Sequence, residues 1–390
     1  MVKVIKFALR PNLKYPFQLI IWHLLRKIET MLISYLFNFG DSLVYIPLMF
    51  IGEFVSGLIF YSYQNKFFQK VKEKEPKIIP ETLLHNEIIL SYPDSDLKIK
   101  VLIAFVAYFD WIQFIIWLVT VPKYKYISNS IVSRLSGILA ISSAFFYSYV
   151  IKIKIFKHHK FSLIIIGICT IIVIITEFIF QEINIFLSYG KFIIVILLSI
   201  LSQVFNAFLD SIEKYLFEYD YVNPFYALMY EGVFGFFMTF FYFTIPDYLD
   251  DIKLVYKTYS AGELVLFTFL LLLYIVLCGG RNIFRVITTK IYSPMTRGLT
   301  DYFINPIYYI YHFSLGNDFI KQGDKNIPYF IINLIISLII SFCGCVYNEF
   351  IVLFCCGLER NTHDQIARRA SEIPYELNKV NDPSENADDD

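Results

Sequence analysis

The stretch LMFIGEF, residues 48–54, places the carboxylate of Glu53 inside a segment that is otherwise almost wholly apolar from Leu43 to Tyr61. A charge near the middle of a membrane segment costs about 2.5–3.5 kcal/mol on insertion scales, so it persists only where a cavity or a partner compensates. Glu53 is therefore predicted to face the interior of a helix bundle. There it is either a functional group or a very well paired structural one.

The composition indicates a membrane protein that crosses the bilayer many times. Of 390 residues, 57% are hydrophobic and only 17% are charged, which is too apolar for a soluble globular protein of this length. Runs long enough to cross about 30 Å of hydrocarbon recur along the chain. An all-α fold with ten spans is predicted, near residues 15–38, 41–63, 100–121, 128–150, 161–181, 191–212, 225–245, 263–284, 295–313 and 328–354.

The first of these runs is interrupted by Arg26, Lys27 and Glu29. No small-residue cleavage site follows it, which argues against a signal sequence. Arg26 and Glu29 lie three residues apart on one helical face and can pair, so a true span is favoured over an interfacial helix.

Lys and Arg are distributed unevenly between the two sides of the membrane. With ten spans and an internal amino terminus, most of them fall in the terminal segments and in the loops 64–99, 151–160, 213–224 and 285–297. Positively charged loops stay in the cytoplasm, so both termini are predicted to be cytoplasmic. The loop 64–99 is interpreted as solvated, with one short helix near 81–90, and the acidic tail 359–390 as partly disordered.

Cysteine and histidine usage points away from disulfides and metals. None of the six cysteines falls in a predicted external loop, so no disulfide framework is expected. Cys343 and Cys345 lie two apart in an apolar helix and point to different sides, which suits packing better than zinc. His158 and His159 belong to the basic stretch KIKIFKHHK, 152–160, and are interpreted as solvated. No metal and no cofactor are expected.

Two pairs of short segments indicate an internal repeat. LMFIGEF at 48–54 is similar to LMYEGVF at 228–234, and SIVSR at 130–134 is similar to SPMTR at 293–297. The matches place span 2 on span 7 and span 4 on span 9. Because five spans separate the members of each pair, the two halves, residues 1–190 and 191–358, are predicted to be inverted five-helix repeats. This architecture is typical of transporters that alternate access around a site near the bilayer midplane.

Longer stretches of the chain resemble a known family. QVFNAFLDSIEKYLFEYDYVNPFYALMYEGVFGFF, 203–237, is similar to the span 6, loop and span 7 region of the drug/metabolite transporter superfamily. LLLLYIVLCGGRNIFRVITTKIYSPMTRGLTD, 270–301, resembles its span 8 and 9 region, and PLMFIGEF, 47–54, resembles the Met-Phe-Gly-Glu-Phe motif of its second span. The similarity is greatest to nucleotide-sugar-transporter-like and chloroquine-resistance-transporter-like members. It implies solute transport in Golgi, vesicular or lysosome-like membranes.

The sequence departs from the family in two places. The first span is interrupted, and the fourth, with SRLSGILAISS at 133–143, is simpler than the amide-rich and glycine-rich span that many members carry. These departures leave the solute open.

Charged and polar residues within the predicted spans are the candidate binding groups. Glu53 and Glu231 lie in paired spans, and each is either a cation- or proton-coupling ligand or a partner of a neighbouring helix. Arg134 and Arg297 would lie toward opposite mouths of the pathway. Two such guanidinium groups could bind an anionic solute in bidentate fashion, although structural ion pairs are the alternative.

Two further pairs place polar side chains on single helical faces. Asp110 with Gln113, and Gln203 with Asn206, are each three residues apart, so each face must meet the bundle interior rather than lipid. Substrate contact and interhelical hydrogen bonding remain equally open for them. Glu213 with Lys214 is interpreted as a gate or a surface pair. The predicted substrate-binding set is Glu53, Asp110, Gln113, Arg134, Gln203, Asn206, Glu231 and Arg297.

The sequence favours transport over catalysis. No nucleotide-binding loop, catalytic serine motif or metal-spaced histidine cluster is apparent, so ATP hydrolysis and an enzymatic role are not expected. The leading hypothesis is a secondary transporter or exchanger of a small polar, anionic metabolite of nucleotide-sugar, phosphate or drug/metabolite type. Short external loops without a glycosylation sequon favour an endomembrane. Membrane lipid is an expected partner, nucleic acid is not, and a homodimer is left open.

Two other classes of function compete with this hypothesis. One is a non-transporting structural or accessory subunit of a membrane assembly, to which the irregular first span lends some support. The other is a membrane-embedded lipid-modifying enzyme, which would need polar residues clustered at one interface. The charges are instead distributed through several spans.

Overall fold

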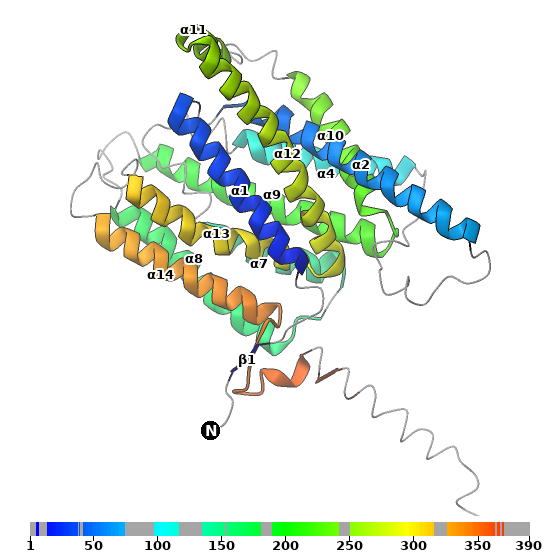
Figure 1. The fold of residues 1–390 in the computed structure, drawn as a ribbon. Helices are drawn as coiled ribbons and strands as arrows, with labels where there is room; N and C mark the ends of the chain where they lie inside the picture. Colours follow the sequence, from blue (N-terminus) through cyan, green and yellow to red (C-terminus); the bar gives the residue numbers. More distant parts are fainter. Residues whose placement is uncertain are drawn as a thin grey trace, which may run out of the picture.

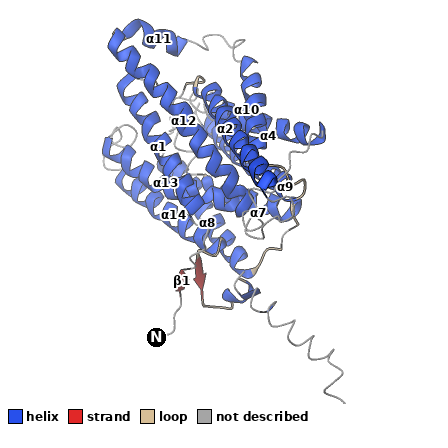
Figure 2. Ribbon diagram, turned by 45° about the vertical axis from the view of Figure 1, so that its right-hand side comes forward, coloured by secondary structure: helices blue, strands red, loops and turns tan. Residues whose placement is uncertain are grey.

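The architecture is that of a helix bundle with a small two-stranded sheet at one end (Figures 1 and 2). It was obtained as a computed structural model. The structure describes residues 5–7, 14–37, 39, 42–74, 97–116, 135–152, 154–180, 189–241, 250–315, 326–362, 365–366 and 369.

Eleven helices lie within these described ranges. They are α1 (Lys14–Phe37), α2 (Tyr45–Lys74), α4 (Leu97–Ile115), α7 (Ser136–Val150), α8 (Lys157–Phe180), α9 (Tyr189–Glu218), α10 (Pro224–Thr239), α11 (Asp250–Thr258), α12 (Ala261–Ile291), α13 (Pro294–Leu315) and α14 (Asn326–Tyr347). The strands are β1 (Ile5–Phe7) and β2 (Ile351–Leu353), and a 3-10 turn covers Glu359–Asn361. Each of the ten predicted spans overlaps one of these helices, and α11 is an additional short one.

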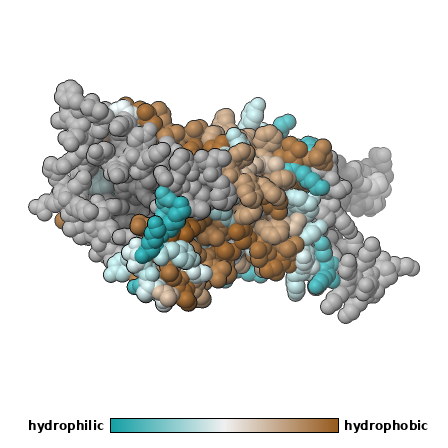
Figure 3. All heavy atoms as spheres, turned by 90° about the horizontal axis from the view of Figure 1, so that it is seen from above, coloured by the Kyte–Doolittle hydropathy of each residue, from teal (hydrophilic) through white to brown (hydrophobic). Residues whose placement is uncertain are grey.

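Five helices are long and apolar enough to cross a membrane. They are α2 over Tyr45–Lys66, α8, α9, α12 and α14, and α7 is a shorter apolar helix. Seen from above, one face of the molecule carries a broad hydrophobic area with polar side chains on either side (Figure 3). The prediction of a mainly helical, multi-pass membrane protein is therefore compatible with the structure.

The contact between α2 and α10 is close and antiparallel. A Cβ on Gly57 would lie 2.6 Å from the backbone nitrogen of Met229, and a Cβ on Gly232 would meet the backbone nitrogen of Phe54. The later residue of α2 thus meets the earlier residue of α10, so the two helices run in opposite directions.

The helix contacts fall into corresponding pairs. If α1, α2, α4, α7 and α8 correspond to α9, α10, α12, α13 and α14, then the contact of α1 with α12 corresponds to that of α9 with α4. The contacts of α2 with α12 and of α7 with α9 likewise correspond to those of α10 with α4 and of α13 with α1. The contact of α13 with α14 corresponds to that of α7 with α8, and the contacts of α2 with α10, α7 with α13 and α8 with α14 each join a helix to its own counterpart.

The first predicted span is a regular helix packed into the bundle. One face of α1 is buried, and this face carries Leu19, His23, Arg26, Glu29 and Ile33. It lies against α12 and α13, as Figure 1 shows for the front of the bundle. Arg26 and Glu29 do share a buried face, as the spacing predicted, while their direct pairing stays a prediction.

Several predicted boundaries are wrong because helices continue or stop at points that hydropathy does not mark. The helix α2 continues to Lys74, beyond the predicted end at 63, and α12 continues to Ile291 rather than ending at 284. Both extensions mix polar with apolar residues and contain no glycine or proline that would break the helix. The predicted helix 81–90, most of the loop around it and the last residues of the tail lie outside the described residues.

The last span ends seven residues earlier than predicted, and a strand follows it. The helix α14 stops at Tyr347, and Ile351 pairs with Phe7 in an antiparallel ladder that joins β2 to β1. The β-branched pair Ile351 and Val352 suits an extended backbone. This sheet corrects the purely all-α prediction, and it brings the two terminal segments together at one end of the bundle (Figure 1).

Candidate functional site

Six polar side chains are gathered where α2, α4, α9, α10 and α12 meet. We call this group the central cluster; it consists of Glu53, Asp110, Glu213, Glu231, Asn282 and Arg285. All six are buried. The first two come from the amino-terminal half of the chain and the other four from the carboxy-terminal half, so the cluster joins the predicted repeats.

Arg285 is the centre of an ion-pair network. Its side chain is 2% exposed, and its Nη2 lies 2.6 Å from Oε2 of Glu231 and 2.9 Å from Oε1 of Glu213. The two carboxylates are as deeply buried as the guanidinium. Such a network is stable only while both the guanidinium and the carboxylates are present, because removal of one partner leaves an uncompensated buried charge.

Glu53 is bound on one oxygen only. Nδ2 of Asn282 donates a 2.7 Å hydrogen bond to Oε1 of Glu53, whereas Oε2 is buried and has no hydrogen-bond partner within the described part of the chain. The side chain is 1% exposed, so the prediction that it faces the bundle interior is confirmed.

Glycines next to the two glutamates allow the helices to approach each other. A Cβ on Gly52 would lie 2.6 Å from the carbonyl oxygen of Ile275, so only glycine lets α2 lie this close to α12. Gly232 likewise lets α10 lie close to α2, because a Cβ there would meet the backbone of Phe54. Because Gly52 precedes Glu53 and Gly232 follows Glu231, each close approach carries a carboxylate into the interface.

The start of α10 is fixed by a side-chain cap. Oδ1 of Asn223 accepts hydrogen bonds from the backbone N–H groups of Phe225 and Tyr226, at 2.9 and 3.4 Å, and Pro224 occupies the first helical position. Nδ2 of Asn223 also donates to Gln64 of α2 at 2.7 Å. The cap therefore sets both where α10 begins and how it lies on α2, which places Glu231.

Acidic groups outnumber basic ones in and around the central cluster. Asp110, which accepts a 2.6 Å hydrogen bond from Gln113, lies within electrostatic range of Glu53, Glu213, Glu231 and Arg285. Arg281 is the other nearby cation; it donates to Asn282 at 3.0 Å and to His23 at 3.3 Å. Four carboxylates thus face two guanidinium groups.

A second polar group lies between α9 and α13. The guanidinium of Arg297 pairs with the buried carboxylate of Asp210 and donates to Oδ1 of Asn206 at 2.9 Å. Gln203 is also buried on α9. With Glu213, these residues recur at intervals of three and four, so one polar face of α9 connects Arg297 to the central cluster.

The structure brings most of the predicted binding residues together in two groups. Glu53, Asp110, Gln113 and Glu231 belong to or adjoin the central cluster, and Gln203, Asn206 and Arg297 form the group on α9 and α13. Arg134 lies outside the described residues. Arg297 forms a buried ion pair, which was the alternative to solute binding for this residue.

The surface interpretation of Glu213 and Lys214 is wrong. Glu213 is 0% exposed and contacts Arg285, while Nζ of Lys214 donates to the carbonyl oxygen of Lys290 at 2.6 Å and pairs with Glu218 at 2.8 Å. Lys214 thereby satisfies a carbonyl in the last turn of α12, where helices leave such groups unpaired.

The sequence-based prediction omits three residues that form the site. It places Arg285 in the cytoplasmic loop 285–297, and it gives no role to Asn282 or Asp210. The signal was present in RNIFRV, 281–286, where apolar residues continue between two arginines and thus indicate a helix that does not stop at 284.

The solvated interpretation of His158 is also wrong. His158 is 3% exposed and lies near Glu349, which follows α14, at the end of the bundle where α8 begins. His158 and Glu349 are not members of the central cluster.

Comparison of the chain with protein-family models and with curated proteins finds no match.

Proposed function

We propose that the protein is a secondary transporter or exchanger that moves a small polar, anionic solute by alternating access. In this proposal ten helices span the membrane as two inverted five-helix repeats, and the central cluster lies on the solute path between them. The helical fold and the resemblance to drug/metabolite transporters both support a role in transport. An endomembrane with both termini in the cytoplasm remains part of the proposal.

The observation that carries the proposal is the surplus of buried carboxylates. A carboxylate is costly in a membrane interior unless a proton, a cation or a paired base compensates its charge. Arg285 compensates Glu213 and Glu231 most directly, and Arg281 contributes from further away. Glu53 makes no ion pair with a base in the described part of the chain and keeps one oxygen unbonded, which suits a site for a coupling proton or cation.

The packing supports inverted repeats independently of the cluster. Alternating access requires two related halves that can rock against each other between states of similar free energy. The antiparallel contact of α2 with α10 and the correspondence of the other helix pairs are what such a duplication would produce.

Arg285 is the best candidate for recognition of the solute. A guanidinium binds carboxylate or phosphate through two parallel hydrogen bonds, and Arg285 already binds two carboxylates of the protein. An anionic group on the solute could take the place of Glu213, while Glu231 keeps its 2.6 Å contact. The pair of Arg297 with Asp210 would then close one side of the path.

The experiment is a counterflow assay in proteoliposomes loaded in turn with nucleotides, sugar phosphates and carboxylates. We expect the native protein to exchange at least one anionic solute and Arg285→Gln to lose that exchange. Asp250→Asn, which removes an exposed carboxylate paired with Lys253 on α11, is the matched control and should behave as the native protein. If a folded native protein exchanges no solute of the panel, the rival of a non-transporting accessory subunit is favoured.

A further inference from the structure

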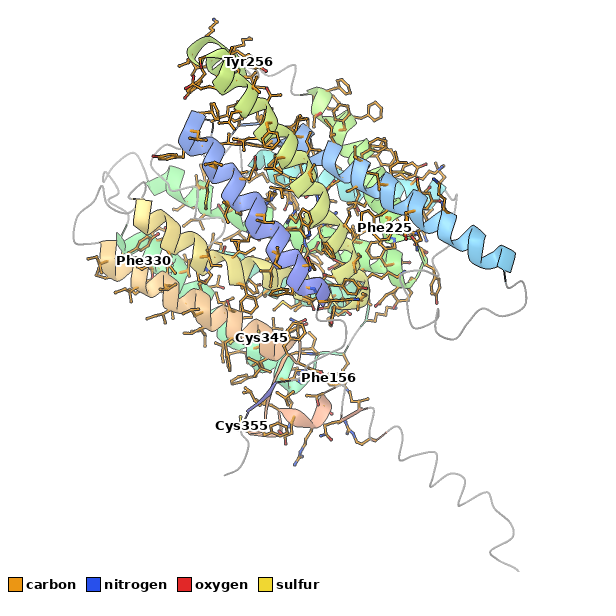
Figure 4. The ribbon with its side chains drawn as sticks, viewed as in Figure 1. Phe156, Phe225, Tyr256, Phe330, Cys345 and Cys355 are labelled. Carbon is orange, nitrogen blue, oxygen red and sulfur yellow. The ribbon has the colours of Figure 1, made fainter. Side chains whose placement is uncertain are left out.

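Three potential metal ligands converge where α8 begins and α14 ends. His158 and His159 lie in the first turn of α8, and Glu349 follows α14; one ligand atom from each lies within 4.8 Å of the others. The helices run antiparallel, which is why residues so distant in the sequence meet. Phe156 and Cys345, which precede the histidines and Glu349 in the sequence, are both found at this end of the bundle (Figure 4).

The distance between the ligand atoms of His158 and Glu349 fits coordination to one ion. Zinc binds imidazole nitrogen and carboxylate oxygen at about 2.0–2.2 Å, so two ligands in a tetrahedral site lie roughly 3.3 Å apart. Nε2 of His158 lies 3.4 Å from Oε1 of Glu349. His159 Nδ1 accepts a 3.3 Å hydrogen bond from the N–H of Phe156, and a metal bond could replace this long contact.

The ring nitrogens of His158 form no hydrogen bond within the described part of the chain. The side chain is 3% exposed, and its Nε2 faces the carboxylate of Glu349 at 3.4 Å without a hydrogen bond. A buried polar group in this state calls for an unseen partner, such as an ion. The neighbouring Lys157 and Lys160 are exposed, so their charges can remain in solvent.

The backbone of Glu349 supplies an independent observation. Its φ is 59°, and the N–H of Phe350 bonds to the carbonyl oxygen of Cys345 at 2.9 Å, as in the Schellman termination of a helix. Glycine is strongly favoured at this left-handed position because side chains are strained there. A buried glutamate at this position indicates that its carboxylate makes an interaction that offsets the strain.

We propose that His158, His159 and Glu349 bind one Zn²⁺ ion, with water in the fourth position. Two imidazoles and one carboxylate are ligands that suit zinc rather than magnesium or calcium. The ion joins the start of α8 to the end of α14. The neighbouring Asn348 accepts a hydrogen bond from Thr296, so the ion also fixes α13 at this end. This site is independent of the transport proposal.

The test measures zinc bound to the purified full-length protein in detergent. The protein is stripped with chelator, incubated with ZnCl₂, passed through a desalting column and analysed for zinc per chain by mass spectrometry. We expect about one zinc per chain and a higher thermal unfolding temperature with zinc than without. X-ray absorption should show a shell of nitrogen and oxygen with two imidazoles.

Glu349→Gly is the decisive variant because glycine suits the helix termination while the ligand is lost. It should fold as well as the native protein, bind little zinc and gain no thermal stability from it. His158→Gln should behave in the same way toward zinc. A variant with Cys355→Ser and Cys356→Ser, which lacks two exposed thiols, should bind zinc as the native protein does.

Two results would overturn the proposal. One is a native protein that retains no zinc, which would leave His158 and Glu349 as an ion pair only. The other is a Glu349→Gly or His158→Gln variant that binds as much zinc as the native protein.

Discussion

At the scale of single residues, the central cluster explains how charges are tolerated inside this bundle. Arg285 and its two carboxylates satisfy one another, and Glu53 is held by the neutral Asn282. Sequence reasoning found Glu53, Asp110 and Glu231 because a carboxylate in an apolar run is conspicuous. It missed Arg285 because a base near the predicted end of a span is read as a loop residue under the positive-inside rule.

Arg285→Gln is predicted to destabilise the protein by about 3–5 kcal/mol, because Glu213 and Glu231 are then buried without a base. Thermal or denaturant unfolding in detergent measures the loss. Combining Arg285→Gln with Glu231→Gln should cost less than the sum of the two single variants, since the double variant leaves one fewer unpaired charge. A variant Arg285→Gln as stable as the native protein would contradict the network.

At the scale of elements, glycines and caps decide where the helices lie. The apolar runs predicted all ten helical segments, since hydrophobic length is a strong signal. Their ends depend on local groups that hydropathy does not register, such as the cap at Asn223 and the left-handed Glu349. The strand pairing of β1 with β2 joins residues from opposite ends of the chain and has no local signal.

Gly232→Ala is predicted to destabilise the protein by about 1–3 kcal/mol, because the new methyl group would meet the backbone of α2. Gly262→Ala is the matched control: Gly262 lies in the first turn of α12 with nothing within 4 Å of an added Cβ. That change should be neutral or stabilise by up to about 1 kcal/mol. Unfolding temperatures of the two variants provide the comparison, and equal effects would count against the close α2–α10 contact.

At the scale of the whole molecule, the helix contacts fall into pairs that fit a duplication, while the inverted repeat drawn from the short sequence matches stays a prediction. The structure does show that α2 and α10, the helices of the matched segments LMFIGEF and LMYEGVF, pack antiparallel. Their glutamates have different partners, because Glu53 accepts a hydrogen bond from Asn282 whereas Glu231 pairs with Arg285. This difference is consistent with separate roles for the two carboxylates.

The antiparallel arrangement predicts which engineered cysteines can be joined. Phe60 and Phe225 have ring centroids 5.5 Å apart, so their side chains are neighbours and Phe60→Cys with Phe225→Cys should be joined by a short thiol-reactive crosslinker. Phe60→Cys with Phe237→Cys is the control, because Phe237 is near the opposite end of α10. Both pairs are made in a background with Cys355→Ser and Cys356→Ser and are followed by a gel shift after protease cleavage between the halves. Joining of the control pair alone would require a parallel arrangement.

The most direct test of the proposed coupling is gradient-driven uptake in proteoliposomes, with the native protein compared with Glu53→Gln. The glutamine can still accept the hydrogen bond from Asn282 but cannot ionise. The account predicts that the native protein accumulates solute when a proton or sodium gradient is imposed, whereas Glu53→Gln only exchanges solute without accumulating it. Equal accumulation by the two proteins would contradict the account.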